Sequence, residues 1–353
     1  MKLNELRTSI EDKGLDGFLT CQNARYLADT SAPEAVIVTE DKPILVCGRM
    51  EADRARAESR IKEIRAFAKT EIPLRKGEKV FFGEFGEFLA KIIEELNLNV
   101  IGHDQIKNSI LEKIQENCQA DLRKEQEIIQ NLRKTKTSEE IKRMKKAGEI
   151  ASQGMKVAKN IIEAGAAEIE IAAEIEYKMR KLGSEGTPFD TIVASGKNSV
   201  FPHREATEKK IEKEELVTVD LGARWKGYNS DMTQTFATSP NSKQQKVINT
   251  VKKAQKSALE TVEAGVNVKE VDEAAREVFR ENDYEEFYLH GVGHGVGLDI
   301  HEPPNLSPSS EDVLEEGMVV TIEPGLYIKG TGGCRFEDTV SVKEEGYEKL
   351  TDL

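Results

Sequence analysis

The chain has 353 residues, a net charge of −13 at pH 7 and a hydrophobic fraction of 38%. This length exceeds one ordinary hydrophobic core and predicts two domains. The negative charge argues against nucleic acid or an anionic membrane as a partner, because both call for basic patches on the protein. A basic run at residues 133–136 is surrounded by acids and is interpreted as a solvated helix end.

The N-terminal residues are polar and amphipathic, without the apolar core that a signal peptide needs, and no apolar run of transmembrane length follows. The four cysteines are widely scattered and form no CxxC pair, so neither a thiolate zinc site nor a disulfide framework is indicated. We therefore expect reduced thiols and a cytoplasmic location.

Residues 1–125 alternate strand-like and helix-like segments. Short apolar runs between turn residues lie at 15–20, 35–39, 43–47 and 79–83, and helical patterns include 50–59 and 88–96. Such alternation predicts a small α/β domain. It contains no cluster of acids and imidazoles, so we assign it no catalytic chemistry.

A second domain is expected over residues 126–353. Thr137, followed by Glu140 three residues later, matches a capping box and predicts that a long amphipathic helix begins there.

This second domain contains an internal duplication. The sequence IIEAG at 161–165 recurs as TVEAG at 261–265, and each copy closes a helix at a glycine. Later, VTVDLG at 217–222 recurs as VTIEPG at 320–325, each a strand pattern that ends in an acid and a glycine. Two helix–helix–strand halves related by a pseudo-two-fold axis would bring both acids to one central site.

Asp220 and Asp231 flank a predicted hairpin. If its turn is centred between Trp225 and Lys226, the two aspartates lie directly opposite each other, with Cβ atoms about 4.5–5.5 Å apart. Two like charges so close are destabilising unless a cation lies between them, and a divalent ion would serve. A slipped register, which would leave both acids solvated, is the alternative.

Glu323 and Glu337 flank a glycine-rich loop with its midpoint at Gly330, and we expect them to lie opposite each other as well. The segment HGVGHGVGLDIHE adds nitrogen donors, because its glycines allow close approach of the backbone while His290, His294 and His301 point inward. A nucleotide-binding glycine loop is excluded because no signal for a helix start follows.

The four carboxylates contribute a charge of −4, which two divalent ions balance, and one neutral imidazole, His294, completes the set. A site with four oxygen-donor residues and one nitrogen donor suits Mn²⁺ best, with Co²⁺, Fe²⁺ or Zn²⁺ also able to bind. The residues thus predict a two-metal hydrolase.

At these positions the sequence resembles the metallopeptidase family with the pita-bread fold, which includes methionine aminopeptidase, aminopeptidase P, prolidase and the metal-free creatinase. All five positions of the family's ligand pattern are present: Asp220, Asp231, His294, Glu323 and Glu337. The N-terminal residues resemble the creatinase-type domain of proline-directed members. The resemblance implies an α/β N-terminal domain and an α+β pita-bread catalytic domain.

The resemblance also implies roles for these ligands. Asp220 would bind one metal in a bidentate manner, and Asp231 and Glu337 would bridge two metals. His294 and Glu323 would complete the other metal's shell, and Glu323 would also carry protons.

Four further residues match active-site positions of the family. His301 matches the histidine that stabilises the tetrahedral intermediate, and His203 matches a histidine near the substrate amide. His290 matches a further histidine of the proline-specific members, and Arg335 matches an arginine that supports the metal ligands.

The implied substrates are peptides with proline in the second position, and the implied assembly is a homodimer. Many relatives have an arginine where this chain has Asn305, and some dipeptidases use it at the substrate. This departure favours a Xaa-Pro aminopeptidase over the alternative, a Xaa-Pro dipeptidase (prolidase). A second departure is Cys47-Gly48-Arg49-Met50, where relatives commonly have Asp-x-Arg-Tyr; contacts with a partner subunit or substrate are expected to differ there.

Two rival hypotheses are a non-catalytic binding protein on the same fold and a metal-free hydrolase of the creatinase kind. Both are disfavoured by the complete ligand set, and metal analysis would separate them from a peptidase.

Overall fold

The computed structural model describes residues 2–353. The chain divides into two compact units, and the boundary lies between Arg133 and Lys134. The boundary expected after residue 125 falls earlier, just before helix α6 (Gln126–Lys134). No helix among residues 2–353 combines the length and the apolar composition that crossing a bilayer requires.

The N-terminal unit is built on a mixed seven-stranded sheet. Its strands are β1 (Gly17–Thr20), β2 (Ala35–Thr39), β3 (Pro43–Gly48), β4 (Glu63–Ala68), β5 (Val80–Phe82), β6 (Val100–His103) and β7 (Asp121–Lys124). Their order across the sheet is β5-β4-β3-β2-β1-β6-β7. The four predicted strands are confirmed as β1, β2, β3 and β5, whereas β4, β6 and β7 were not anticipated from apolar runs.

Helices and apolar residues around this sheet form the core of the unit. The helices that precede α6 are α1 (Leu3–Asp12), α2 (Ala24–Ala28), the 3-10 turn η1 (Arg49–Glu51), α3 (Ala52–Glu58), α4 (Phe85–Glu95) and α5 (Asn108–Asn117). The predicted helices at 50–59 and 88–96 are confirmed as α3 and α4. Helix α4 begins earlier than expected because Glu87 accepts a hydrogen bond from the backbone N–H of Glu84 (3.0 Å) and caps the first turn.

The second unit begins with the first of two similar halves. Its elements are α7 (Ser138–Ile161), α8 (Glu168–Lys181), β8 (Ile192–Ser195), β9 (Leu216–Leu221), β10 (Arg224–Trp225), β11 (Tyr228–Asn229) and β12 (Met232–Ala237). The expected capping box is confirmed, because Glu140 accepts a hydrogen bond from the backbone N–H of Thr137 (2.8 Å) at the start of α7. Strands β12, β9 and β8 form an antiparallel sheet, against which α7 and α8 pack.

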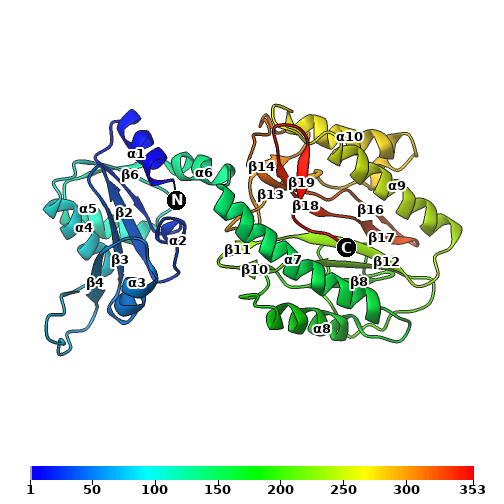
Figure 1. Ribbon diagram of the computed structural model, residues 1–353, viewed down its shortest axis with the longest axis horizontal. Helices are drawn as coiled ribbons and strands as arrows, with labels where there is room; N and C mark the ends of the chain where they lie inside the picture. Colours follow the sequence, from blue (N-terminus) through cyan, green and yellow to red (C-terminus); the bar gives the residue numbers. More distant parts are fainter. Residues whose placement is uncertain (1) are drawn as a thin grey trace. The chain divides into compact units, whose positions relative to one another are not determined.

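The second half repeats the helix pair and adds strands. Its elements are α9 (Ser242–Leu259), α10 (Val268–Arg280), the 3-10 turn η2 (Glu285–Phe287), β13 (Gly293–Gly295), β14 (Glu302–Leu306), β15 (Val319–Ile322), β16 (Gly325–Ile328), β17 (Gly332–Arg335), β18 (Asp338–Val342) and β19 (Tyr347–Lys349). One sheet has the order β14-β13-β15-β18-β19, and β16 pairs with β17. Figure 1 shows α9 and α10 on one side of the strands of this unit and α8 on the other.

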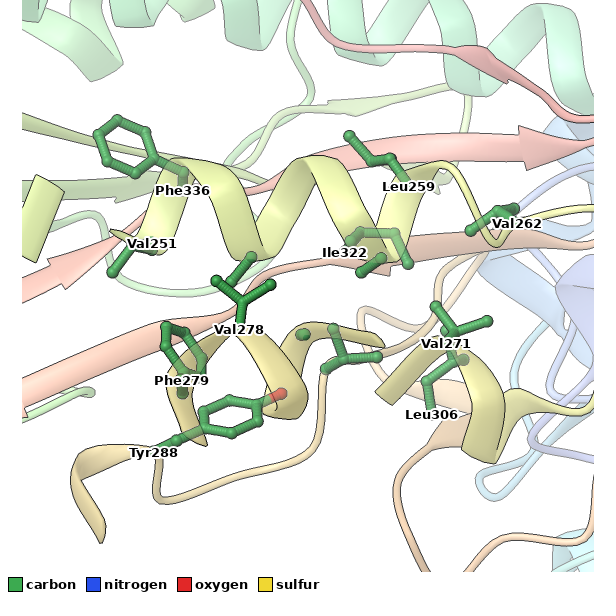
Figure 2. Packing of buried hydrophobic residues seen from close by; sticks show 14 of the residues in the cluster. Val251, Leu259, Val262, Val271, Val278, Phe279, Tyr288, Leu306, Ile322 and Phe336 are labelled. Atoms are coloured by element: carbon green, nitrogen blue, oxygen red, sulfur yellow. The ribbon is translucent and has the colours of Figure 1, made fainter. Parts of the chain in front are cut away.

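The largest apolar cluster joins the helix pair of the second half to its strands. This cluster includes Val251 and Leu259 on α9, Val278 and Phe279 on α10, and Ile322 on β15, which appears between the two helices in Figure 2. Each such side chain contributes about 1.5–3 kcal/mol when it is fully buried. This packing fixes the end of β15, where Glu323 follows.

The duplication read from the sequence has a structural counterpart in the turn between the helices of each pair. Gly165 and Gly265 both have a left-handed backbone, with φ of 100° and 92°. Their N–H groups donate to Ile211 O and Leu314 O, both at 2.8 Å. Each half therefore ties its inter-helix turn to the same kind of returning segment.

The register predicted for the Asp220 hairpin is wrong. Asp220 pairs with Thr233, not with Asp231, and Trp225 pairs with Tyr228. Lys226 and Gly227 both have positive φ, at 48° and 84°, so they form the two central positions of the turn. Since a two-residue hairpin turn of this kind needs positive φ at both positions, the turn lies one residue later than assumed.

The second predicted pairing agrees with the structure. Ile322 pairs with Asp338 on one side, and Gly325 pairs with Arg335 on the other. Glu323 and Glu337 lie between these two pairs of strands. The register on both sides places them opposite each other, as expected.

The basic run at residues 133–136 is not simply a solvated helix end. Lys136 Nζ lies 2.8 Å from Glu302 Oε1, and these side chains are only 2% and 6% exposed. Lys134 pairs with Asp312 at 2.7 Å in a more open setting. The interpretation was wrong because sequence neighbours do not reveal that β14 returns beside this segment.

Candidate active site

All nine predicted site residues lie on the wall of one open cleft of about 990 Å³ in the second unit. They are His203, Asp220, Asp231, His290, His294, His301, Glu323, Arg335 and Glu337. They come from segments far apart in the chain, and the two halves contribute to the same wall.

The first half supplies the two aspartates from a single hairpin. Asp220 lies near the end of β9, and Asp231 immediately precedes β12. Arg335 Nη2 donates to Asp220 Oδ2 (2.7 Å), while the backbone N–H of Asp231 donates to Thr339 Oγ1 (3.2 Å). Both aspartates are thus held by residues of the second half.

The second half supplies one histidine and two glutamates from three strands. His294 lies on β13, Glu323 follows β15, and Glu337 precedes β18. Two threonine hydroxyls orient the glutamates: Thr321 donates to Glu323 (3.2 Å), and Thr233 donates to Glu337 (2.7 Å).

Three of the five expected ligands already form a compact group. One ligand atom each from Asp231, His294 and Glu337 lies within 4.8 Å of the other two. The remaining two have other partners. Asp220 binds Arg335, and Glu323 Oε1 lies 3.2 Å from His294 Nε2.

Burial makes the acids of this site resist ionisation. Desolvation, and then the charge of Glu337, raise the pKa of Asp231 well above its usual value. Desolvation and the charge of Glu323 do the same to the pKa of Glu337, and desolvation also raises the pKa of Asp220. Such mutual repulsion is relieved when a cation binds between the carboxylates.

Glu323 and His294 behave as an ion pair. Burial opposes the charge on Glu323, but the hydrogen bond and charge of His294 outweigh burial and lower the pKa of Glu323 to about 2. Burial likewise opposes the charge on His294, and the hydrogen bond to Glu323 overcomes it and raises the pKa of His294. A metal at His294 would have to displace this proton.

The donor set is suited to a divalent metal. Asp220 Oδ1, Asp231 Oδ1 and Glu337 Oε1 are buried carboxylate oxygens without a hydrogen-bond partner. Buried polar atoms are rarely left in this state, because an unsatisfied acceptor costs about 1–3 kcal/mol. Oxygen atoms that converge in this way provide the coordination that hard divalent cations prefer.

The other polar residues line the same cleft in different environments. His290 Nε2 lies 3.0 Å from the Tyr327 hydroxyl, which also accepts a hydrogen bond from Arg335 Nη1 (2.7 Å). Burial lowers the pKa of His290, whereas desolvation and the neighbouring His294 lower the pKa of His301. The rings of His301 and His294 meet edge to face at 4.3 Å. His203 is exposed on a loop at the rim.

Several residues that build the site were not singled out from the sequence. Thr233 is the most informative, because it bridges Glu337 and Arg335 (Nε, 3.1 Å). It lies two residues after Asp231 and therefore on the same face of the strand, a signal that alternation in SDMTQT contained. Tyr327 gave no comparable signal, because its role depends on how β16 folds back.

Comparisons with known proteins agree with this geometry. Residues 142–344 match the family described as "Metallopeptidase family M24", and residues 2–135 match the "Creatinase/Prolidase N-terminal domain". The chain is 38% identical to the Xaa-Pro dipeptidase of Pyrococcus furiosus, over 99% of this chain and 97% of the relative.

Solved structures share the whole architecture. A structure of a Xaa-Pro dipeptidase from Bacillus anthracis is 34% identical with a TM-score of 0.91, covering 100% of this chain and 97% of that one. A structure of an X-Pro aminopeptidase from Thermotoga maritima is 31% identical with a TM-score of 0.89, covering 100% and 98%. The expected creatinase-type and pita-bread domains are thereby confirmed, and the chain belongs to metallopeptidase family M24.

Proposed function

We propose that this chain is a two-metal Xaa-Pro dipeptidase. The observation that carries the proposal is the set of buried, unpartnered carboxylate oxygens on Asp220, Asp231 and Glu337 beside His294 in an open cleft. The substrate class comes from relatives that are named Xaa-Pro dipeptidases. Those names favour the dipeptidase alternative over the aminopeptidase that Asn305 suggested.

Asp220, Asp231, His294, Glu323 and Glu337 would hold the metals, and the excess of oxygen donors favours Mn²⁺. Two divalent ions in such a site lower the pKa of a bound water and polarise the scissile carbonyl. Arg335 keeps Asp220 oriented through its 2.7 Å contact. These ligand roles are part of the proposal.

The surrounding residues provide proton transfer and charge stabilisation. Because the pKa of His301 is lowered, its neutral ring can donate an N–H to the oxyanion that develops on the carbonyl oxygen. His290, held by Tyr327, would contact the substrate backbone. Glu323, oriented by Thr321, is ionised, so it can accept a proton from the attacking water and then pass that proton to the departing proline nitrogen.

A dipeptidase must also recognise the free carboxylate of the substrate. His203 and Asn305 line the cleft and can each donate a hydrogen bond to it. We assign the larger contribution to His203, whose exposed ring can donate an N–H to the carboxylate.

A Xaa-Pro aminopeptidase is the second candidate, and Asn305 favours it. Without a guanidinium at this position, the open cleft has less reason to reject a longer peptide. The related X-Pro aminopeptidase from Thermotoga maritima has the same architecture.

The two candidates differ in the peptide that they cleave. Purified protein with Mn²⁺ is assayed on a Xaa-Pro dipeptide, the matching Xaa-Pro-Yaa tripeptide and a Xaa-Ala dipeptide, each with and without a chelator. Chelator-sensitive cleavage of the Xaa-Pro dipeptide alone is expected. Cleavage of the tripeptide alone would reverse the choice, and release of residues without regard to proline would remove both candidates.

His203→Ala sharpens this assay. Loss of a carboxylate contact should raise KM for the dipeptide far more than it raises Ki for the tripeptide as a competitive inhibitor, because the carboxylate of the tripeptide lies one residue further away. An equal change for both peptides would argue against His203 as the carboxylate anchor.

We further propose a cytoplasmic homodimer in which residues 1–125 form the creatinase-type domain and residues 126–353 the catalytic domain. The four cysteines are free, as a reducing compartment would keep them. Light scattering coupled to size-exclusion chromatography tests the dimer, because a monomer at micromolar concentration would contradict it.

A further inference from the structure

The loop at residues 196–207, here called the His203 loop, forms part of the cleft wall. It leaves β8 after Ser195, and Pro202, His203 and Glu205 on it line the cleft. Phe201 at its tip is 61% exposed. Packing at the tip is therefore sparse, and the position of His203 depends on how the base of the loop is held.

Glu168 holds both ends of this loop. It is fully buried and is the first residue of α8. Its Oε1 accepts hydrogen bonds from the backbone N–H and the hydroxyl of Ser195, both at 2.7 Å. Its Oε2 accepts hydrogen bonds from the N–H (3.2 Å) and the hydroxyl (2.6 Å) of Thr207. The amide of Asn198 donates to both oxygens, at 3.2 and 3.0 Å.

The arrangement uses the full acceptor capacity of an ionised carboxylate. A carboxylate offers about four acceptor positions, and here it is surrounded by donors on both oxygens. The N-terminus of α8 favours negative charge, and Lys209 Nζ lies 2.8 Å from Ser195 Oγ. A neutral amide of the same size would present an NH₂ group to one set of these donors.

The base of the loop also packs closely on the strand that carries Arg335. The N–H of Gly333 on β17 donates to Ser199 Oγ (2.8 Å). A Cβ at Gly333 would lie 1.8 Å from Ser199 O, so no side chain fits there. The loop is therefore fixed between α8 and β17, and its tip extends over the cleft.

We infer that Glu168 is a positioning residue, which sets His203 over the cleft by holding both ends of the His203 loop. It is not among the residues that line the cleft, so it acts through His203. The activity tests rest on the proposed function; the exchange test does not.

The hydrogen bonds that Glu168 accepts from both ends of the His203 loop are called the clamp. Hydrogen exchange of the Glu168→Gln variant tests this clamp directly. Backbone amides at 196–207 should exchange at least about 10-fold faster than in the wild type, because the carboxylate no longer ties the ends together. Glu174→Gln, an exposed glutamate of the same helix, is the matched control and should leave this exchange unchanged. Unchanged protection of 196–207 in Glu168→Gln would overturn the inference.

Kinetics then show whether the clamp acts through His203. For Glu168→Gln we expect kcat/KM for a Xaa-Pro dipeptide to fall about 10–100-fold, the scale of an ångström-sized misplacement, mostly through KM and with metal content retained. Adding Glu168→Gln to His203→Ala should lower kcat/KM by less than about 2-fold further, because residues that act as one unit are not additive. Additive losses would overturn the inference.

A milder variant covers the case in which Glu168→Gln does not fold. Thr207→Val removes one donor and keeps the shape of the side chain, so it should raise exchange at 196–207 and KM in the same direction by a smaller factor. If His203→Ala hydrolyses the dipeptide like the wild type while exchange responds to Glu168, the role of His203 in the proposed function fails and the clamp stands.

Discussion

The two halves of the catalytic unit share one plan and divide the chemistry unequally. The first half, residues 138–237, contributes two aspartates from a single hairpin. The second half, residues 242–342, contributes His294, Glu323 and Glu337 from three separate strands. Each half begins with two helices joined at a glycine with positive φ. The repeated backbone thus determines where the strands end, while the side chains at those ends determine what they bind.

Each half also has a buried acid that restrains a histidine segment. In the first half Glu168 binds uncharged donors, and its histidine lies on an exposed loop. In the second half Asp272 on α10 binds Arg276 Nε (3.1 Å) and the Tyr288 hydroxyl (3.3 Å). Tyr288, which packs on α10 in Figure 2, meets His290 edge to face at 5.4 Å. His203 is exposed, whereas His290 packs against Tyr288 and Tyr327.

Contacts across the halves show that neither forms a site alone. Asp220 of the first half is held by Arg335 of the second, and Glu337 is held by Thr233 of the first. We therefore expect that substitution of a site residue in either half abolishes the same activity.

Removal of one metal ligand from either half should have the largest effect. Asp231→Asn and Glu337→Gln should each lower metal content and reduce kcat/KM by at least about 10³-fold, the upper end for loss of one preorganised charge contact. The metal-free variants should nevertheless unfold at higher temperature than the metal-free wild type, because one of two repelling buried carboxylates is gone. Metal analysis and calorimetry measure both.

Asp190→Asn is the control for these ligand variants, since Asp190 lines the cleft outside the ligand group. It should keep its metals. Retention of two ions by either ligand variant would mean that the substituted residue is not needed to hold the metals.

Breaking the buried Lys136–Glu302 pair should have the next largest effect. Lys136 precedes α7 and Glu302 lies on β14, so the pair joins the start of the first half to a strand of the second. Lys136→Met should lower the free energy of unfolding by about 3–5 kcal/mol, because the buried carboxylate of Glu302 loses its ion pair with Lys136. The double variant with Glu302→Gln should recover part of this loss.

Lys134→Met in the same basic run is the matched control. Its pair with Asp312 is 23% and 34% exposed and should contribute only about 0–1 kcal/mol. Denaturant unfolding measures the loss of stability in both variants. Equal losses for Lys136→Met and Lys134→Met would contradict the distinction between a buried and a more exposed ion pair.

The smallest effect is expected for Asp272, the buried aspartate on α10 of the second half. Burial raises the pKa of Asp272 above its ordinary value of 3.8, against the opposing effects of Arg276 and Tyr288. The folded state therefore binds this proton more tightly than the unfolded state, and the stabilisation fades as pH rises above the ordinary pKa. Asp272→Asn should be less stable by about 1.5 kcal/mol near pH 4, and the gap should narrow as pH rises.

Thermal unfolding with a chelator present, compared between pH 4 and pH 7, measures this trend for Asp272. Glu270→Gln, an exposed glutamate of α10, should follow the wild type throughout. A gap that widens with pH would reverse the sign and exclude a raised pKa.

The sequence determined much of this protein because local patterns carry their own physical cause. Alternation and turn residues gave strands β2 and β3, and Thr137 with Glu140 gave the start of α7. The nine site residues predicted from the sequence all line the cleft, since few chemistries need acids and imidazoles at the ends of apolar strands. The repeat of VTVDLG as VTIEPG indicated that two distant acids would meet.

Only the tertiary structure decided how these residues are held. Whether the turn lies at Lys226-Gly227 or one residue earlier depends on backbone angles that residue types leave open, and that choice set the partner of Asp220. Lys136 is buried because a distant segment of the chain returns beside it. Glu168 likewise accepts hydrogen bonds from both ends of the His203 loop, which are distant from it in the sequence. Long-range packing brings such groups into hydrogen-bond distance, and no local pattern records it.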